Sequence, residues 1–106
     1  CWKLNERFGV PDMARRVQET RRTGWYLRVV EPGSVGAGDE IVLVERPYPD
    51  WTLHRLMVLL YGAPQEPAVV REALALPLVP SWRALLERRL ATGRIEDWTS
   101  RLEGPG

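Results

Sequence analysis

The spacing of hydrophobic and polar residues changes twice along the chain, once near residue 24 and again near residue 51. Before the first change, apolar residues recur three and four positions apart, at Val10, Met13, Ala14 and Val17. Residues at these separations lie on one face of an α-helix, so the pattern predicts an amphipathic helix over residues 10–24. We expect Gly24 to end this helix, because glycine readily takes the left-handed conformation.

The segment between the two changes has the pattern of β-strands. The stretch "WYLRVVE" at 25–31 alternates between two faces and predicts one strand, followed by a turn at Pro32 and Gly33. The stretch "EIVLVER" at 40–46 is β-branched and apolar on both faces, which predicts a second, buried strand. Two strands alone are not stable in water, so this pair is expected to need partners.

After residue 51 the helical spacing returns, broken by prolines and glycines. Thr52 is expected to cap a first helix, Pro67 to begin a second and Ser81 to cap a third. A short fourth segment is indicated by the apolar residues Ile95, Trp98 and Leu102. Short loops place successive helices side by side, so residues 52–103 are expected to form one compact helical lobe.

Together these patterns predict an α+β fold. Residues 1–50 would form one domain with a helix and at least two strands, and residues 51–106 a small helical domain. The joint is expected at Pro47 to Asp50, where the strand pattern ends.

Charge and composition exclude several functions. Fifteen basic and fourteen acidic residues give a net charge of +1, too balanced for a dedicated nucleic-acid binder. No apolar run approaches the roughly 18 residues of a membrane span, so no membrane association is expected. One cysteine cannot form an internal disulfide, which suits a reducing compartment and predicts a cytoplasmic protein.

The chain also lacks the motifs of common catalytic sites. With one cysteine and one histidine, Cys1 and His54, it cannot build a four-ligand zinc site. The stretch "GSVGAG" at 33–38 lies between two predicted strands and lacks the helix amino terminus that binds phosphate, so we interpret it as a turn. His54 falls in the first turn of a distal helix, where a surface position is expected rather than a dyad with Cys1.

Cys1 is the residue with two open interpretations. A free cysteine commonly packs as a small hydrophobic residue. However, Lys3 and Arg7 are close in sequence, and nearby cations favour the thiolate that binds metals. In an extended segment, Cys1, Lys3 and Asn5 would point to the same face. A single thiol can serve a metal only if an organic cofactor with its own sulfurs supplies the remaining ligands.

The order of motifs resembles one known family. The opening "CWKLN", then "RFG", a helix, "TGWYLRVVEPGSVGAGDEIVLVERP" and several short helices are similar to the MOSC family, in its bacterial branch with a three-helix extension. The stretch 23–47 is the most specific part, and the resemblance covers nearly the whole chain. It implies that residues 1–50 are the last part of a MOSC β-barrel, that residues 51–106 are the three-helix domain, and that the chain corresponds to the C-terminal half of such a protein.

The resemblance further implies molybdenum chemistry. Cys1 would bind the metal of the molybdenum cofactor, a molybdopterin, and the complex would reduce N-hydroxylated compounds such as hydroxylaminopurines and amidoximes to amines. Lys3 and Asn5 are candidates for hydrogen bonds to the thiolate or the cofactor. Trp25 and Tyr26 are candidates to line the substrate entrance. Alternatively, the two aromatic residues pack inside the barrel and Lys3 is a solvent-exposed lysine.

Partners and rival functions follow from the same resemblance. A flavoprotein or other reductase would supply electrons, and the chain alone is expected to be inactive, because the cofactor phosphate is held by the first half of family members. One alternative is a sulfur carrier that holds a persulfide on Cys1. Another is a non-catalytic chain that only binds partners.

Overall fold

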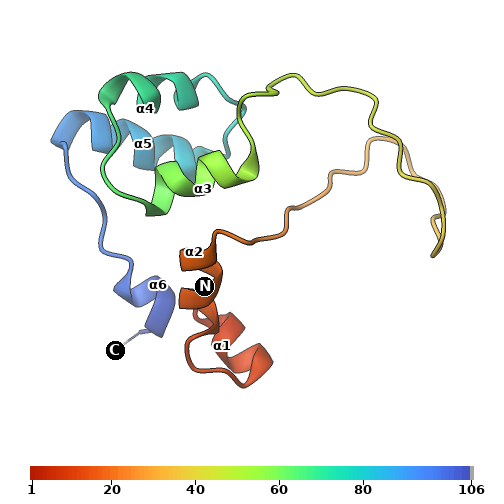
Figure 1. The fold of residues 1–106 in the computed structure, drawn as a ribbon, viewed down its shortest axis with the longest axis horizontal. Helices are drawn as coiled ribbons and strands as arrows, with labels where there is room; N and C mark the ends of the chain where they lie inside the picture. Colours follow the sequence, from red (N-terminus) through yellow and green to blue (C-terminus); the bar gives the residue numbers. More distant parts are fainter. Residues whose placement is uncertain (106) are drawn as a thin grey trace.

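The computed structural model describes residues 1–105, which contain six helices in two groups (Figure 1). The first group, called here the terminal group, consists of α1 (Lys3–Phe8), α2 (Met13–Thr20) and α6 (Thr99–Glu103). The second, called the three-helix group, consists of α3 (Leu53–Tyr61), α4 (Pro67–Leu74) and α5 (Pro80–Thr92). The two ends of the chain lie in the terminal group, and the three-helix group packs above it in the view of Figure 1.

The predicted α+β fold is wrong, because residues 1–105 contain no β-strand. The segment 22–52 instead runs away from the helices as a long extended excursion (Figure 1). Its large apolar side chains between residues 25 and 44 face solvent, as the exposed fractions of Leu27 (83%) and Ile41 (97%) show. Trp51, near its end, is partly buried against the core of the three-helix group. A strand needs a neighbour for its backbone groups and a layer over its apolar face, and the described residues supply neither for 25–31 or 40–46. The expected barrel portion is therefore not formed in this structure.

The three-helix group has its own hydrophobic core. Ala73 and Leu86 are completely buried where α4 packs on α5. The buried side chains of this core are Leu59, Leu60, Val70, Ala73, Leu76 and Leu86. Burying one large aliphatic side chain contributes about 1.5–3 kcal/mol, so these contacts account for much of the group's stability.

Most helix boundaries follow local stereochemistry. The Thr52 hydroxyl oxygen accepts a hydrogen bond from the backbone N–H of Arg55 at 3.1 Å, which confirms the predicted cap. Pro67 begins α4, as predicted. Ser81 does not cap α5, because the helix already starts at Pro80, whose fixed φ suits the first helical position.

The end of α2 differs from the prediction. The helix stops at Thr20, and Arg21 takes the left-handed conformation with φ of 55°. Gly24 lies beyond, in the extended segment, so it does not end the helix. A non-glycine residue in this conformation carries a modest steric cost, which the surrounding contacts must offset.

The short fourth segment forms α6, but it does not complete the three-helix group. It packs on α1 and α2, where the side chain of Asn5 joins all three helices of the terminal group. The amide nitrogen of Asn5 donates to the carbonyl of Leu102 at 2.9 Å, and its oxygen accepts from the backbone N–H of Ala14 at 2.7 Å. The last segment of the predicted lobe thus lies in the terminal group, while Trp98 just before it contacts Tyr61 and Trp82 of the three-helix group.

Arg89 is the one buried charged residue among residues 1–105, and its contacts explain why a buried charge is tolerated there. Its guanidinium donates to the carbonyls of Leu59 and Leu60 at the end of α3, and to Glu96 at 2.8 Å. The last carbonyls of a helix have no partner within the helix, so Arg89 supplies the missing donors.

Among residues 1–105, none of the helices combines the length and the apolar character that a membrane crossing requires.

Candidate functional site

A cavity of about 260 Å³ lies between the terminal group and the three-helix group. We call it the Cys1 cavity. Cys1, Leu4, Ala14 and Val17 line it from one side, and Met57, Tyr61 and Trp82 from the other. Arg101 on α6 and Tyr26 at the start of the extended segment also contribute to its wall. The cavity therefore brings together residues that are up to 100 positions apart in the sequence.

Cys1 is a free and solvent-exposed cysteine at this wall. In this structure Cys1 is therefore not buried, and its role as a metal ligand stays a prediction. Arg101 lines the same cavity as Cys1.

Lys3 and Asn5 do not share a face with Cys1. Residues 3–8 form helix α1, not the extended segment on which that expectation depended, so positions two residues apart point in different directions. Lys3 is exposed, and neither residue lines the Cys1 cavity. The side-chain amide of Asn5 is engaged by Leu102 and Ala14. A role for either residue toward a cofactor stays a prediction.

Trp25 and Tyr26 lie at the start of the extended segment. Tyr26 lies at the mouth of the Cys1 cavity with its ring fully exposed, and Trp25 is 70% exposed beside it. Both rings line an open depression together with Thr23 and Gly24. Neither ring is packed inside a barrel in this structure, and of the two only Tyr26 lines the Cys1 cavity.

Sequence reasoning missed an aromatic cluster behind the cavity. Tyr61, Trp82 and Trp98 come from α3, α5 and the start of α6, and the rings of Tyr61 and Trp98 meet edge to face at 4.8 Å. The Arg101 guanidinium lies 5.7, 5.5 and 5.8 Å from the ring centroids of Tyr61, Trp82 and Trp98. Trp98 and Arg101 are three residues apart, a spacing that places them on one helix face and could have suggested their contact.

The cluster also changes the acidity of Tyr61. Burial raises the pKa of the Tyr61 hydroxyl above its ordinary value of 10.0, and the charges of Arg101 and Arg89 oppose this change. Tyr61 is therefore neutral at physiological pH and presents a hydrogen-bonding hydroxyl group rather than a charge.

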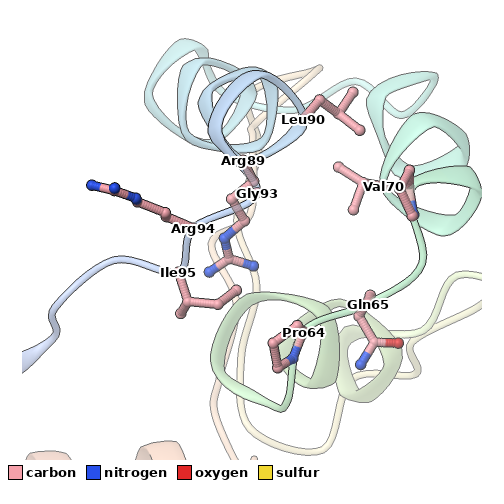
Figure 2. Close-up of a pocket in the computed structure, with 9 residues that line it drawn as sticks. Pro64, Gln65, Val70, Arg89, Leu90, Gly93, Arg94 and Ile95 are labelled. Atoms are coloured by element: carbon pink, nitrogen blue, oxygen red, sulfur yellow. The ribbon is translucent and has the colours of Figure 1, made fainter.

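A second cavity of about 110 Å³ lies inside the three-helix group (Figure 2). Val70, Leu90, Pro64 and Ile95 surround it, and Arg94 points away from it. The buried guanidinium of Arg89 at its edge is already bound to two carbonyls and to Glu96. We interpret this cavity as a packing gap rather than a site. His54 is exposed on α3 and lines neither of the two cavities.

We next ask whether the side chains around the Cys1 cavity could act as metal ligands. In the part of the chain that the structure describes, no three His, Cys, Asp or Glu side chains cluster as metal ligands. A metal held by protein ligands alone does not fit. A cofactor that brings its own sulfur ligands needs only one protein thiolate, and the exposed thiol of Cys1 fits that need.

Two consecutive parts of the chain match models of known domain families. Residues 1–42 match the MOSC domain, and residues 51–93 match the domain described as YiiM-like, 3-alpha helix domain. The second match begins just before α3 and ends just after α5, so it covers the three-helix group.

Three curated proteins show how the chain relates to whole proteins. It is 33% identical to Protein YiiM of Escherichia coli K12 over 105 residues, which cover 98% of the chain and 46% of YiiM. It is 33% identical to a protein named "Reductase" from Gibberella moniliformis over 90 residues, or 85% of the chain and 16% of that protein. It is 46% identical to the uncharacterized protein YflK of Bacillus subtilis over 46 residues, or 43% of the chain and 21% of YflK. The chain thus spans less than half the length of these relatives. No solved structure matches it.

Proposed function

Because the chain belongs to the MOSC domain family and carries the YiiM-like three-helix domain, we propose that it forms part of a reductase that uses the molybdenum cofactor to convert N-hydroxylated compounds to amines. Two findings support the proposal at a coarser level. MOSC domains are associated with molybdenum-cofactor binding in general, and one relative is named a reductase. The substrate class and the use of molybdenum go beyond these two findings and are part of the proposal.

The observation that carries the proposal is the position of Cys1. The only thiol of the chain is exposed at the wall of a cavity that also has aromatic and cationic residues. A thiol on the surface without such a cavity could bind a metal but could not hold an organic substrate beside it. Here the thiol and the space for a substrate occur together.

The residues of this chain would act as follows. Cys1 would hold the metal as a thiolate ligand, and the bound cofactor would supply the two-electron reduction of the N–O bond. Tyr61 and Trp82 would form the apolar wall that excludes water from the substrate. Tyr26, at the mouth, would contact the substrate as it enters.

The whole activity would need more than this chain. Its relatives are more than twice as long, and we propose that the additional part holds the remainder of the cofactor and accepts electrons from a flavoprotein or similar reductase. The extended segment 22–52, with its exposed apolar side chains, is consistent with contacts to such an additional part.

The test compares two proteins. One is the 106-residue chain, and the other joins the chain to the part of YiiM that it does not match. We expect only the longer protein to reduce 6-hydroxylaminopurine and to contain molybdenum. Comparable turnover by the short chain would show that it is sufficient by itself.

Within the longer protein, Cys1→Ser removes the proposed ligand. We expect turnover to fall to background and bound molybdenum to decrease, while Ala84→Ser, an exposed change of similar size on α5, leaves both unchanged. Retained activity in Cys1→Ser would eliminate Cys1 as the metal ligand. A protein without molybdenum that carries sulfane sulfur on Cys1 would instead support the sulfur-carrier alternative.

A further inference from the structure

Arg101 is a charged residue in the Cys1 cavity that the proposed function does not yet use. Among residues 1–105, the four ion pairs involve other arginines, and the guanidinium of Arg101 donates no hydrogen bond to a protein acceptor. Its N–H groups are therefore available to a bound molecule. Unlike a lysine, it presents a planar fork of donors with a fixed geometry.

The aromatic cluster holds this guanidinium in place. The charge lies within 6 Å of three ring centroids, a distance at which ring faces attract cations. The main chain of Arg101 is also fixed, because its carbonyl accepts a hydrogen bond from the backbone N–H of Trp2 at 2.6 Å. The residue is thus positioned before any ligand binds, which reduces the entropy lost on binding.

Other features of the cavity suit a small planar molecule. Tyr61, Trp82 and Met57 form an apolar wall, while Gln18 and Thr23 add an amide and a hydroxyl group at its rim. Apolar walls with a few converging polar groups are typical of small-molecule sites. All these residues belong to this chain.

We propose that Arg101 is the substrate-positioning residue of this site. The ligand would be a planar heteroaromatic or aryl compound with an exocyclic hydroxylamino or amidoxime group. Its ring would lie against Tyr61 and Trp82, and Arg101 would donate to the N–O oxygen so that this bond is held beside Cys1. The identity of the ligand rests on the proposed function, whereas the recognition of a planar, acceptor-bearing molecule rests on the cavity alone.

The direct test is binding without metal or turnover. The 106-residue chain is titrated with 6-hydroxylaminopurine, and with purine as the probe that lacks the N–O group, by calorimetry and tryptophan fluorescence. We expect Arg101→Gln to weaken the binding of 6-hydroxylaminopurine roughly tenfold, because a charge-assisted hydrogen bond is lost. Purine binding should change little. Arg101→Lys should recover part of the affinity, and Arg88→Gln, an exposed change on α5, should have no effect.

Structural damage would have a different signature. If Arg101→Gln collapsed the cavity, it would weaken the binding of 6-hydroxylaminopurine and of purine by the same factor. An affinity ratio of the two compounds that is the same in Arg101→Gln as in the unaltered chain would therefore overturn the proposal. If Arg101→Gln does not fold, the unaltered chain is titrated and followed by NMR. Shifts of the Trp82 and Arg101 side-chain N–H signals on addition of 6-hydroxylaminopurine support the proposal, and their absence contradicts it.

The result can be separated from that of the proposed function. If the chain binds through Arg101 but the longer protein contains no molybdenum, the reductase proposal fails while this inference stands. If the longer protein is an active molybdenum reductase and Arg101→Gln leaves its KM for 6-hydroxylaminopurine unchanged, this inference alone fails.

Discussion

Arg89 shows how one side chain connects parts of the three-helix group that are distant in sequence. Its guanidinium lies on α5 and binds the carbonyls of Leu59 and Leu60, thirty and twenty-nine positions away, together with Glu96. Only 5% of this side chain is exposed, so its contacts are made in a poorly solvated environment. Such a charge is stable only while each partner is present.

Removing the charge of Arg89 should destabilise the three-helix group. Arg89→Met keeps an apolar stem of similar length but leaves two helix carbonyls and the Glu96 carboxylate without a donor. We expect the free energy of unfolding to decrease by about 3–5 kcal/mol, which urea denaturation would measure. Arg88→Met changes the exposed neighbour and should cost less than about 0.5 kcal/mol. Equal stability of the two variants would show that the buried contacts of Arg89 contribute nothing.

The role of a single residue could be predicted where it depends only on residues nearby in the sequence. Thr52 and Pro67 act within one helical turn, and both were predicted correctly. The role of Cys1 as a metal ligand stays a prediction, because it depends on a cofactor and not on neighbouring residues alone. Arg101 was missed, because its role appears only when α6 folds back and brings it to the same cavity as Cys1.

At the scale of helices, the Asn5 amide is the link within the terminal group. It donates to α6 through Leu102 and accepts from α2 through Ala14, at 2.9 and 2.7 Å. The three helices are short, with six, eight and five residues, and isolated helices of this length are not stable in water. Their packing, and not their intrinsic propensity, must therefore maintain them.

Asn5→Ala should accordingly loosen this group. Two partly buried backbone groups lose their partner, and we expect a loss of about 1–3 kcal/mol in local stability. Hydrogen exchange of the Ala14 amide would report it directly, since this N–H is bonded to Asn5. Glu6→Ala, an exposed change on the same helix, is the matched control. Unchanged protection of the Ala14 amide in Asn5→Ala would contradict the proposed link.

Helices were predicted better than strands for a physical reason. The backbone hydrogen bonds of a helix lie within one segment, so its sequence periodicity alone can locate it. Helices are accordingly found at 53–61, 67–74 and 80–92, close to the expected positions. Strand pairing requires partners from elsewhere, and alternation alone does not provide them. Segments 25–31 and 40–46 have the residue composition of strands, but in the structure they are extended, unpaired and exposed.

At the scale of the whole molecule, the Cys1 cavity depends on how the two helical groups meet. Contacts between α2 and α3 bring Met57 and Tyr61 opposite Ala14 and Val17. The matches to the MOSC domain and to the YiiM-like domain fall on either side of this meeting point. The family resemblance was predicted from the motifs and is confirmed, but the cavity between the groups could not be predicted, because no local pattern encodes it.

The proposed function requires that Cys1 provide a sulfur ligand to molybdenum at this cavity. X-ray absorption at the molybdenum edge tests it most directly, on the longer protein with Cys1 intact and with Cys1→Ser. We expect the serine variant, where it retains metal, to show one sulfur neighbour fewer, or else to lose the metal entirely. The same number of sulfur neighbours at full metal content in both proteins would contradict it.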